Sequence, residues 1–110
     1  MNHGLSATTV DRIQGVLKRY PAVEKALLYG SRAKGNYRPG SDIDLTLCGT
    51  GLNFSQLTRI NNELDDLLLP YQIDLSLMSF LTHPALLDHI QRVNLVLYER
   101  APVSVEVSPA

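Results

Sequence analysis

Apolar residues recur along the chain with two different periods, and these periods predict a mixed α/β domain. Apolar positions three or four residues apart are typical of helices, and they cover residues 8–20, 54–68 and 84–93. Alternating or short continuous apolar runs are typical of strands, and they cover residues 23–29, 42–48, 71–77 and 95–98. A further short helix is expected at residues 32–34. This order of elements indicates an α/β (α+β) fold with a small mixed β-sheet.

Residues that favour helix ends support these boundaries. Thr8 or Thr9 is expected to cap the first helix, and Asn53, three residues before a glutamine, fits a capping box. No internal repeat and no linker divides the chain. We therefore predict one domain over residues 1–100, followed by a tail at residues 101–110 that frays or docks on a partner.

The strand at residues 42–48 has one apolar and one polar face, because side chains alternate along a strand. Ile43 belongs to the apolar face, and so does Leu75 in the strand at residues 71–77. The helices are too few to cover both faces of so small a sheet. We expect them to pack on the face that carries Ile43 and Leu75, and to leave the opposite face open for catalysis.

The amino-acid composition limits the kinds of partner and of metal site that the protein is expected to have. The chain of 110 residues is 45% hydrophobic and 19% charged, and its net charge of −1 creates no field that would attract nucleic acid or a membrane surface. Cys48 is the only cysteine, which excludes an internal disulfide and a cysteine zinc cluster. No apolar stretch approaches transmembrane length, and residues 1–10 lack the features of a signal peptide. We therefore expect a cytoplasmic protein that binds neither nucleic acid directly nor membranes.

Three aspartates are predicted to share the open face of the sheet. Asp42 and Asp44 are one residue apart in a strand and so point to the same side, and Asp74 takes a polar-face position in the later strand. Converging carboxylates suit a hard cation, since Mg²⁺ prefers oxygen ligands and usually binds substrate phosphates as well. A turn at Gly30 and Ser31 could present backbone N–H groups to a triphosphate. Together these features suggest nucleotidyl transfer.

Other phosphate- and metal-binding patterns do not fit. The segment at residues 30–35 resembles the start of a P-loop, but Asn36 and Tyr37 follow where lysine and serine or threonine are required. No Gly-x-Gly-x-x-Gly dinucleotide fingerprint is present. His89, on the last predicted helix, has no partner at a suitable spacing, and we assign no metal or catalytic role to it or to the other two histidines.

Gly30-Ser31, ten residues, and then Asp42-Ile43-Asp44 closely resembles the signature of the DNA polymerase β-like nucleotidyltransferase superfamily. The fuller run from Leu28 to Leu45 looks like the minimal nucleotidyltransferase (MNT) branch of that superfamily. The likeness extends over about residues 8–100. Such minimal proteins are commonly antitoxins paired with a HEPN-domain ribonuclease toxin, so the resemblance implies a HEPN protein partner.

The resemblance also implies roles for the residues that match the signature. Asp42 and Asp44 would hold two Mg²⁺ ions, with Mn²⁺ as an alternative, and Asp74 would be the third ligand and a candidate base. These three aspartates are therefore the expected catalytic and metal-binding residues. Gly30 and Ser31 would hold the β- and γ-phosphates of ATP, the expected substrate.

Two basic residues follow the turn, and their role stays open at the level of sequence. Arg32 and Lys34 would either neutralise the triphosphate or belong to a solvated basic loop.

The activity that the resemblance implies is transfer of AMP from ATP to a tyrosine hydroxyl of the HEPN toxin. One alternative is an antitoxin that masks its toxin by binding alone. The other is a nucleotidyltransferase acting on a small hydroxyl compound, which the absence of a second, acceptor-binding domain disfavours.

Overall fold

The computed structural model describes residues 3–101. Four strands form one mixed sheet in the order β3-β2-β1-β4. Strand β1 is antiparallel to β2 and to β4, whereas β2 and β3 are parallel. The elements are α1 (Ala7–Leu17), β1 (Lys25–Tyr29), α2 (Ser31–Lys34), β2 (Ile43–Cys48), α3 (Phe54–Asp65), β3 (Ile73–Leu77), the 3₁₀ helix η1 (Met78–Phe80), α4 (Pro84–Arg92) and β4 (Leu95–Glu99). The predicted mixed sheet is confirmed. Residues 102–110, nearly all of the predicted tail, lie outside the described residues.

Side-chain caps define where the helices begin. The Asn53 side chain accepts a hydrogen bond of 2.9 Å from the Gln56 N–H, as the sequence predicts. The first helix differs, because Ser6 is its cap and accepts a hydrogen bond of 3.1 Å from the Thr9 N–H. The prediction that Thr8 or Thr9 caps this helix is therefore wrong. Helix α1 begins at Ala7, before the first residue of the apolar pattern at helical spacing.

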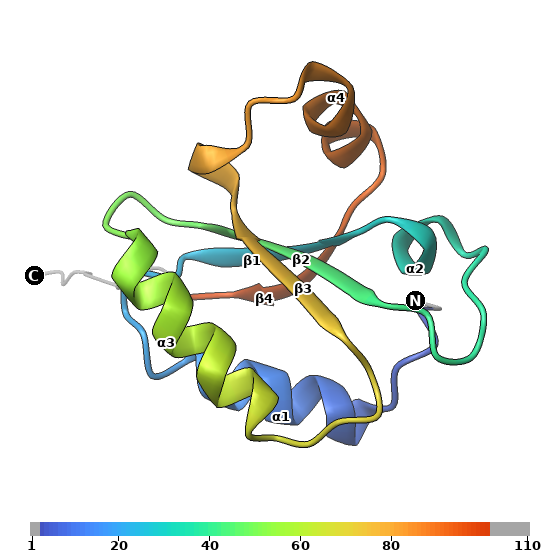
Figure 1. Ribbon diagram of the computed structural model, residues 1–110, viewed down its shortest axis with the longest axis horizontal. Coiled ribbons are helices and arrows are strands. Elements are labelled where there is room, and N and C mark those ends of the chain that lie inside the picture. Colours follow the sequence, from blue (N-terminus) through green and yellow to red (C-terminus); the bar gives the residue numbers. More distant parts are fainter. Residues whose placement is uncertain (1–2, 102–110) are drawn as a thin grey trace, which may run out of the picture.

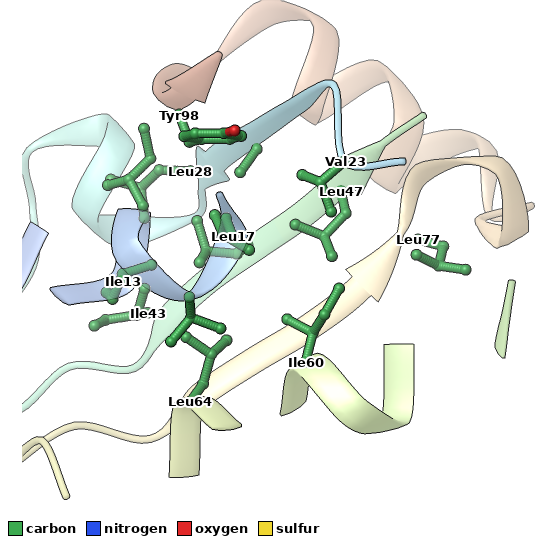
Figure 2. Packing of buried hydrophobic residues seen from close by; sticks show 14 of the residues in the cluster. Ile13, Leu17, Val23, Leu28, Ile43, Leu47, Ile60, Leu64, Leu77 and Tyr98 are labelled. Carbon is green, nitrogen blue, oxygen red and sulfur yellow. The ribbon is translucent and has the colours of Figure 1, made fainter. Parts of the chain in front are cut away.

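Helices α1 and α3 pack together against one face of the sheet (Figure 1). That face carries Ile43, Leu45 and Leu47, each at most 1% exposed, in alternation along β2. Figure 2 shows the resulting cluster, in which the sheet and both helices contribute side chains: Ile13, Leu17, Leu28, Ile43, Leu47, Ile60, Leu64 and Leu77. Each fully buried aliphatic side chain of this kind contributes about 1.5–3 kcal/mol of transfer free energy.

Helix α4 lies on the other side of the sheet from α1 and α3 (Figure 1). Its residue Ile90 is 1% exposed, and Thr46, on the same face of β2 as Asp44, is completely buried. The prediction that the helices pack on the Ile43 face is therefore right for α1 and α3 and wrong for α4, which covers part of the opposite face. Asp42 and Asp74 remain exposed there.

No helix within residues 3–101 is both long and apolar enough to cross a membrane.

Arg100 ties the end of the sheet to the loop between α1 and β1. Its guanidinium donates hydrogen bonds to the carbonyl oxygens of Val23 (3.2 Å), Tyr20 (3.1 Å) and Lys18 (3.3 Å). We expect Arg100→Ala to lower the free energy of unfolding by about 1–3 kcal/mol, because these acceptors lose a charged donor. Urea denaturation measures this change.

The control is Arg92→Ala, which removes an exposed ion pair with Asp88 on α4. Exposed pairs contribute about 0–1 kcal/mol. Equal effects of the two substitutions would show that Arg100 does not hold the loop.

Candidate functional site

The strand register brings the predicted carboxylates to one place on the sheet. Asp44 in β2 is the partner of Asp74 in the parallel strand β3, and of Tyr29 in the antiparallel strand β1. Neighbouring strands lie about 4.8 Å apart, so Asp44 and Asp74 project side by side from the same face. Asp42 lies one residue before β2 begins. All three aspartates therefore gather at the end of β2 nearest to α2.

The negative charges of the three aspartates repel one another, and the pKa of Asp44 reflects this repulsion. Burial raises the pKa of the Asp44 carboxyl above its usual range, and the negative charges of Asp74 and Asp42 raise it further. The nearby His89 acts in the opposite direction. A half-buried carboxylate among like charges is stabilised by a bound cation. The donor set thus fits a divalent metal ion.

The cluster is not a complete metal cage by itself. Among the residues that the structure describes, no group of three or more His, Cys, Asp or Glu side chains could by itself hold a metal ion. Mg²⁺ is usually held by one or two carboxylates together with substrate phosphates, so a phosphate-bearing substrate would complete its coordination.

The turn between β1 and α2 lies directly against Asp44. Gly30 has φ +75° and ψ −153°, a conformation that side-chain-bearing residues rarely adopt. A Cβ atom at this position would lie 2.2 Å from Asp44 Oδ2. Glycine is therefore required at Gly30 both for the backbone conformation and for the close approach of the carboxylate. The turn and the aspartates form one site.

His89 also belongs to this site, which the sequence analysis missed. Its Nε2 accepts a hydrogen bond of 3.2 Å from the Gly30 N–H, and its ring lies edge-on to Tyr29 at 6.3 Å between centroids. The two hydrogen-bonded residues are 59 positions apart. No spacing rule could have found this pair, because only the position of α4 on the sheet brings the imidazole to the turn.

The two basic residues after the turn are placed very differently. Arg32 is 2% exposed, and its guanidinium donates hydrogen bonds to the carbonyl oxygens of Ser41 and His3. Lys34, two residues later at the end of α2, is exposed. The structure therefore leaves Lys34 free to turn toward an anion, whereas Arg32 is engaged in the interior.

His83 caps a helix, and Cys48 is a partly buried residue at the end of β2. The His83 side chain caps α4 by accepting a hydrogen bond of 3.3 Å from the Leu86 N–H. Burial raises the pKa of the Cys48 thiol, so this thiol stays protonated and unreactive at neutral pH.

A cavity of about 340 Å³ lies between α3 and the edge strand β3, and Asp74 is the one carboxylate of the cluster that lines it. Its walls include Phe54, Leu57 and Asn61 from α3, with Gln72 and Asp74 from the other side. Phe54 is 67% exposed, which leaves an aromatic ring at the rim. A side chain of a second substrate could therefore lie beside Asp74.

A protein-family model matches most of this chain. Residues 11–102 match the family model described as "Polymerase beta, Nucleotidyltransferase". No curated protein sequence matches the chain.

Solved structures share the fold at low sequence identity. A chain of a toxin–antitoxin complex crystallised with AMP-PNP has a TM-score of 0.66 at 19% identity, over 83% of this chain and 73% of that one. A chain of the complex between a tri-AMPylated Shewanella oneidensis HEPN toxin and its MNT antitoxin has a TM-score of 0.63 at 17% identity, over 84% and 71%. A nucleotidyltransferase-like protein from Sulfolobus solfataricus has a TM-score of 0.51 at 16% identity, over 88% and 92%.

Proposed function

The chain belongs to the polymerase β nucleotidyltransferase family, and on that premise we propose that it transfers AMP from ATP to a tyrosine hydroxyl of a HEPN-domain toxin. The protein would thereby act as the antitoxin of that toxin. The observation that carries the proposal is the meeting of Asp44 and Asp74 in register beside the Gly30 turn. The similar fold of antitoxin complexes, one of them with an AMPylated HEPN toxin, supports the choice of partner.

The proposed reaction forms one bond and breaks one bond at the α-phosphorus of ATP. The tyrosine oxygen gives its proton to a carboxylate, for which Asp74, exposed and beside the cavity, is the candidate, and attacks the α-phosphorus. The bond to the bridging oxygen of the β-phosphate breaks, and pyrophosphate leaves. The product is a phosphodiester between AMP and tyrosine. Little covalent chemistry remains for the protein, so positioning and charge stabilisation carry the catalysis.

Each residue of the site has a part in that positioning. Asp42, Asp44 and Asp74 would hold two divalent ions, Mg²⁺ or Mn²⁺, which stabilise charge on the attacking and leaving oxygens when bound. The turn at Gly30 and Ser31 would hold the β- and γ-phosphates, with the Ser31 N–H and hydroxyl as the donors, because the Gly30 N–H already donates to His89. The exposed Lys34 would add positive charge there.

Intact-mass spectrometry of the partner tests the proposal. A small helical protein encoded beside this one and carrying the HEPN Arg-x₄₋₆-His pattern is incubated with this protein, ATP and Mg²⁺. We expect the partner to gain one or more AMP units with wild type and none with an Asp42→Asn/Asp44→Asn variant. An unmodified partner that forms a stable complex with both versions would instead indicate an antitoxin that acts by masking.

Transfer to a small molecule is the remaining alternative, and a second arm of the same experiment addresses it. Hydroxyl compounds are incubated with the protein, ATP and Mg²⁺ in the absence of any partner. ATP-dependent transfer in that mixture would overturn the assignment of a protein acceptor.

We expect His89→Ala to lower kcat/KM for transfer about tenfold, because a lost hydrogen bond to the turn costs roughly 1–1.5 kcal/mol. The hydrogen bond from the Gly30 N–H to His89 Nε2 holds the turn that would bind the phosphates. Initial rates at several ATP concentrations measure the effect.

The matched control for His89 is Gln91→Ala, an exposed position on the same helix, for which we expect unchanged rates. Equal rates for wild type and His89→Ala would mean that the turn keeps its shape without the imidazole.

A further inference from the structure

Arg32 is the largest fully buried side chain of the described residues, although it follows directly after the proposed phosphate-binding turn. Its guanidinium lies over two aromatic rings, 5.1 Å from the centroid of Tyr37 and 4.8 Å from that of Tyr71. Stacking of this kind on ring faces is favourable for arginine, whose planar cation is weakly hydrated. The interior thus accommodates the charge without exposing it to solvent.

Backbone carbonyl groups complete the surroundings of the guanidinium. Nε and Nη2 of Arg32 both donate to the Ser41 carbonyl oxygen, at 3.1 and 2.9 Å, and Nη1 donates to that of His3 at 3.0 Å. The ion pairs found within residues 3–101 do not include Arg32. Its charge is therefore balanced by carbonyl dipoles and ring faces, so the arrangement depends on the forked shape of the guanidinium as well as on its charge.

The segments that meet at Arg32 are those that lead into the carboxylates. Ser41 immediately precedes Asp42, and Tyr71 lies three residues before Asp74. A backbone hydrogen bond of 2.8 Å from Ile43 N–H to the Gln72 carbonyl joins the same two segments at the start of the parallel pair. Arg32 thus connects the loop before β2, the segment before β3 and the N-terminal residues.

We infer that Arg32 is a positioning residue that sets the placement of Asp42 relative to Asp74 by joining these two segments, and that it does not contact the triphosphate. This inference rests on the proposed function, in which both carboxylates hold the metal ions. A displacement of about 1 Å at a catalytic group can cost a hundredfold in rate. The exposed Lys34 is then the basic residue of α2 that contacts the phosphates.

The test compares charge-conserving and charge-removing substitutions. In Arg32→Lys the charge remains but the fork is lost, so we expect kcat to fall at least tenfold while KM for ATP stays within twofold. We expect hydrogen exchange at residues 36–42 to become at least tenfold faster, while amides of β1 and β2 keep their protection. Lys34→Gln should raise KM for ATP with hydrogen exchange unchanged.

The matched control is Arg38→Lys, the same substitution at an exposed side chain in the same loop, for which rates and exchange should equal those of wild type. If Arg32→Lys does not fold, Tyr71→Leu removes one of the two rings that contact the guanidinium and should also accelerate exchange at residues 36–42. Arg32→Lys with wild-type kcat and exchange but a raised KM for ATP would overturn the inference. Unchanged exchange in Tyr71→Leu would do the same.

Hydrogen exchange also separates this inference from the proposed function. The exchange measurement requires neither ATP nor a partner. If no AMP transfer is found with wild type, the proposed function fails, and faster exchange at residues 36–42 in Arg32→Lys still supports the role of Arg32 in holding the loop.

Discussion

Asp44→Asn is expected to reduce AMP transfer by at least about a thousandfold and, at the same time, to make the metal-free protein more stable. The loss of activity follows because the amide cannot supply the anionic ligand that a catalytic metal ion requires. Asp44 is also the carboxylate that lies against the Gly30 turn. Radioactive or mass-spectrometric transfer assays measure the activity.

The gain in stability follows from the direction of the Asp44 pKa shift. The folded protein raises this pKa above the ordinary value of 3.8, mainly through burial and then through Asp74 and Asp42. As pH rises from below 3.8, the unfolded chain ionises first, so the free energy of unfolding falls until the folded carboxyl has also ionised. At neutral pH the penalty persists, and the neutral amide removes it.

Thermal denaturation at several pH values measures this effect. Tm of Asp44→Asn should exceed that of wild type at pH 7, because the amide has no charge to bury beside Asp74 and Asp42. The difference should shrink toward acidic pH. Addition of Mg²⁺ with ATP should stabilise wild type more than the variant.

The control is Asp88→Asn, an exposed carboxylate on α4. It should leave both transfer and Tm nearly unchanged. A wild-type rate in Asp44→Asn would remove this residue from the catalytic site, and a lower Tm at pH 7 would contradict the electrostatic argument.

Gly30→Ala is expected to lower transfer by about a hundredfold, the cost of a misplacement of about 1 Å at a catalytic group. The added Cβ would lie 2.2 Å from Asp44 Oδ2, so either the carboxylate or the turn must move. The backbone conformation at Gly30 also costs about 1–3 kcal/mol for a residue with a side chain. Transfer assays and urea denaturation measure the two effects separately.

The chain offers a matched control in Gly15→Ala. Gly15 lies within α1, and a Cβ atom there would meet nothing within 4 Å. Alanine in a helix interior is favoured over glycine by about 1 kcal/mol, so this variant should be more stable and equally active. An active Gly30→Ala variant of wild-type stability would show that the turn is less constrained than its conformation indicates.

Short-range patterns in the sequence were sufficient for most of the elements. The alternation of Ile43, Leu45 and Leu47 with polar residues correctly predicted β2 and the face that α1 and α3 cover. Asn53 correctly marked the start of α3. At α1 the apolar pattern favours the threonines nearest to it, whereas Ser6 is the cap, because several residues near a helix start can cap it and the sequence does not rank them.

The sequence alone also singled out the parts of the candidate site that lie close together in the chain. Asp42 and Asp44 share a face because strand side chains alternate, and Gly30 marks a turn because few other residues adopt its conformation. These signals act over a few residues. They can therefore be recognised without any tertiary structure.

Only the tertiary structure decided which distant groups meet. The parallel pairing of β2 with β3 placed Asp74 beside Asp44, and the position of α4 brought His89 to Gly30 across 59 residues. Arg32 is a basic residue after a glycine–serine turn by sequence, yet the fold buries it against two tyrosine rings. The physical reason is that periodicity and capping depend on neighbours along the chain, whereas the partner of a polar side chain depends on strand order and on the side of the sheet that a helix takes.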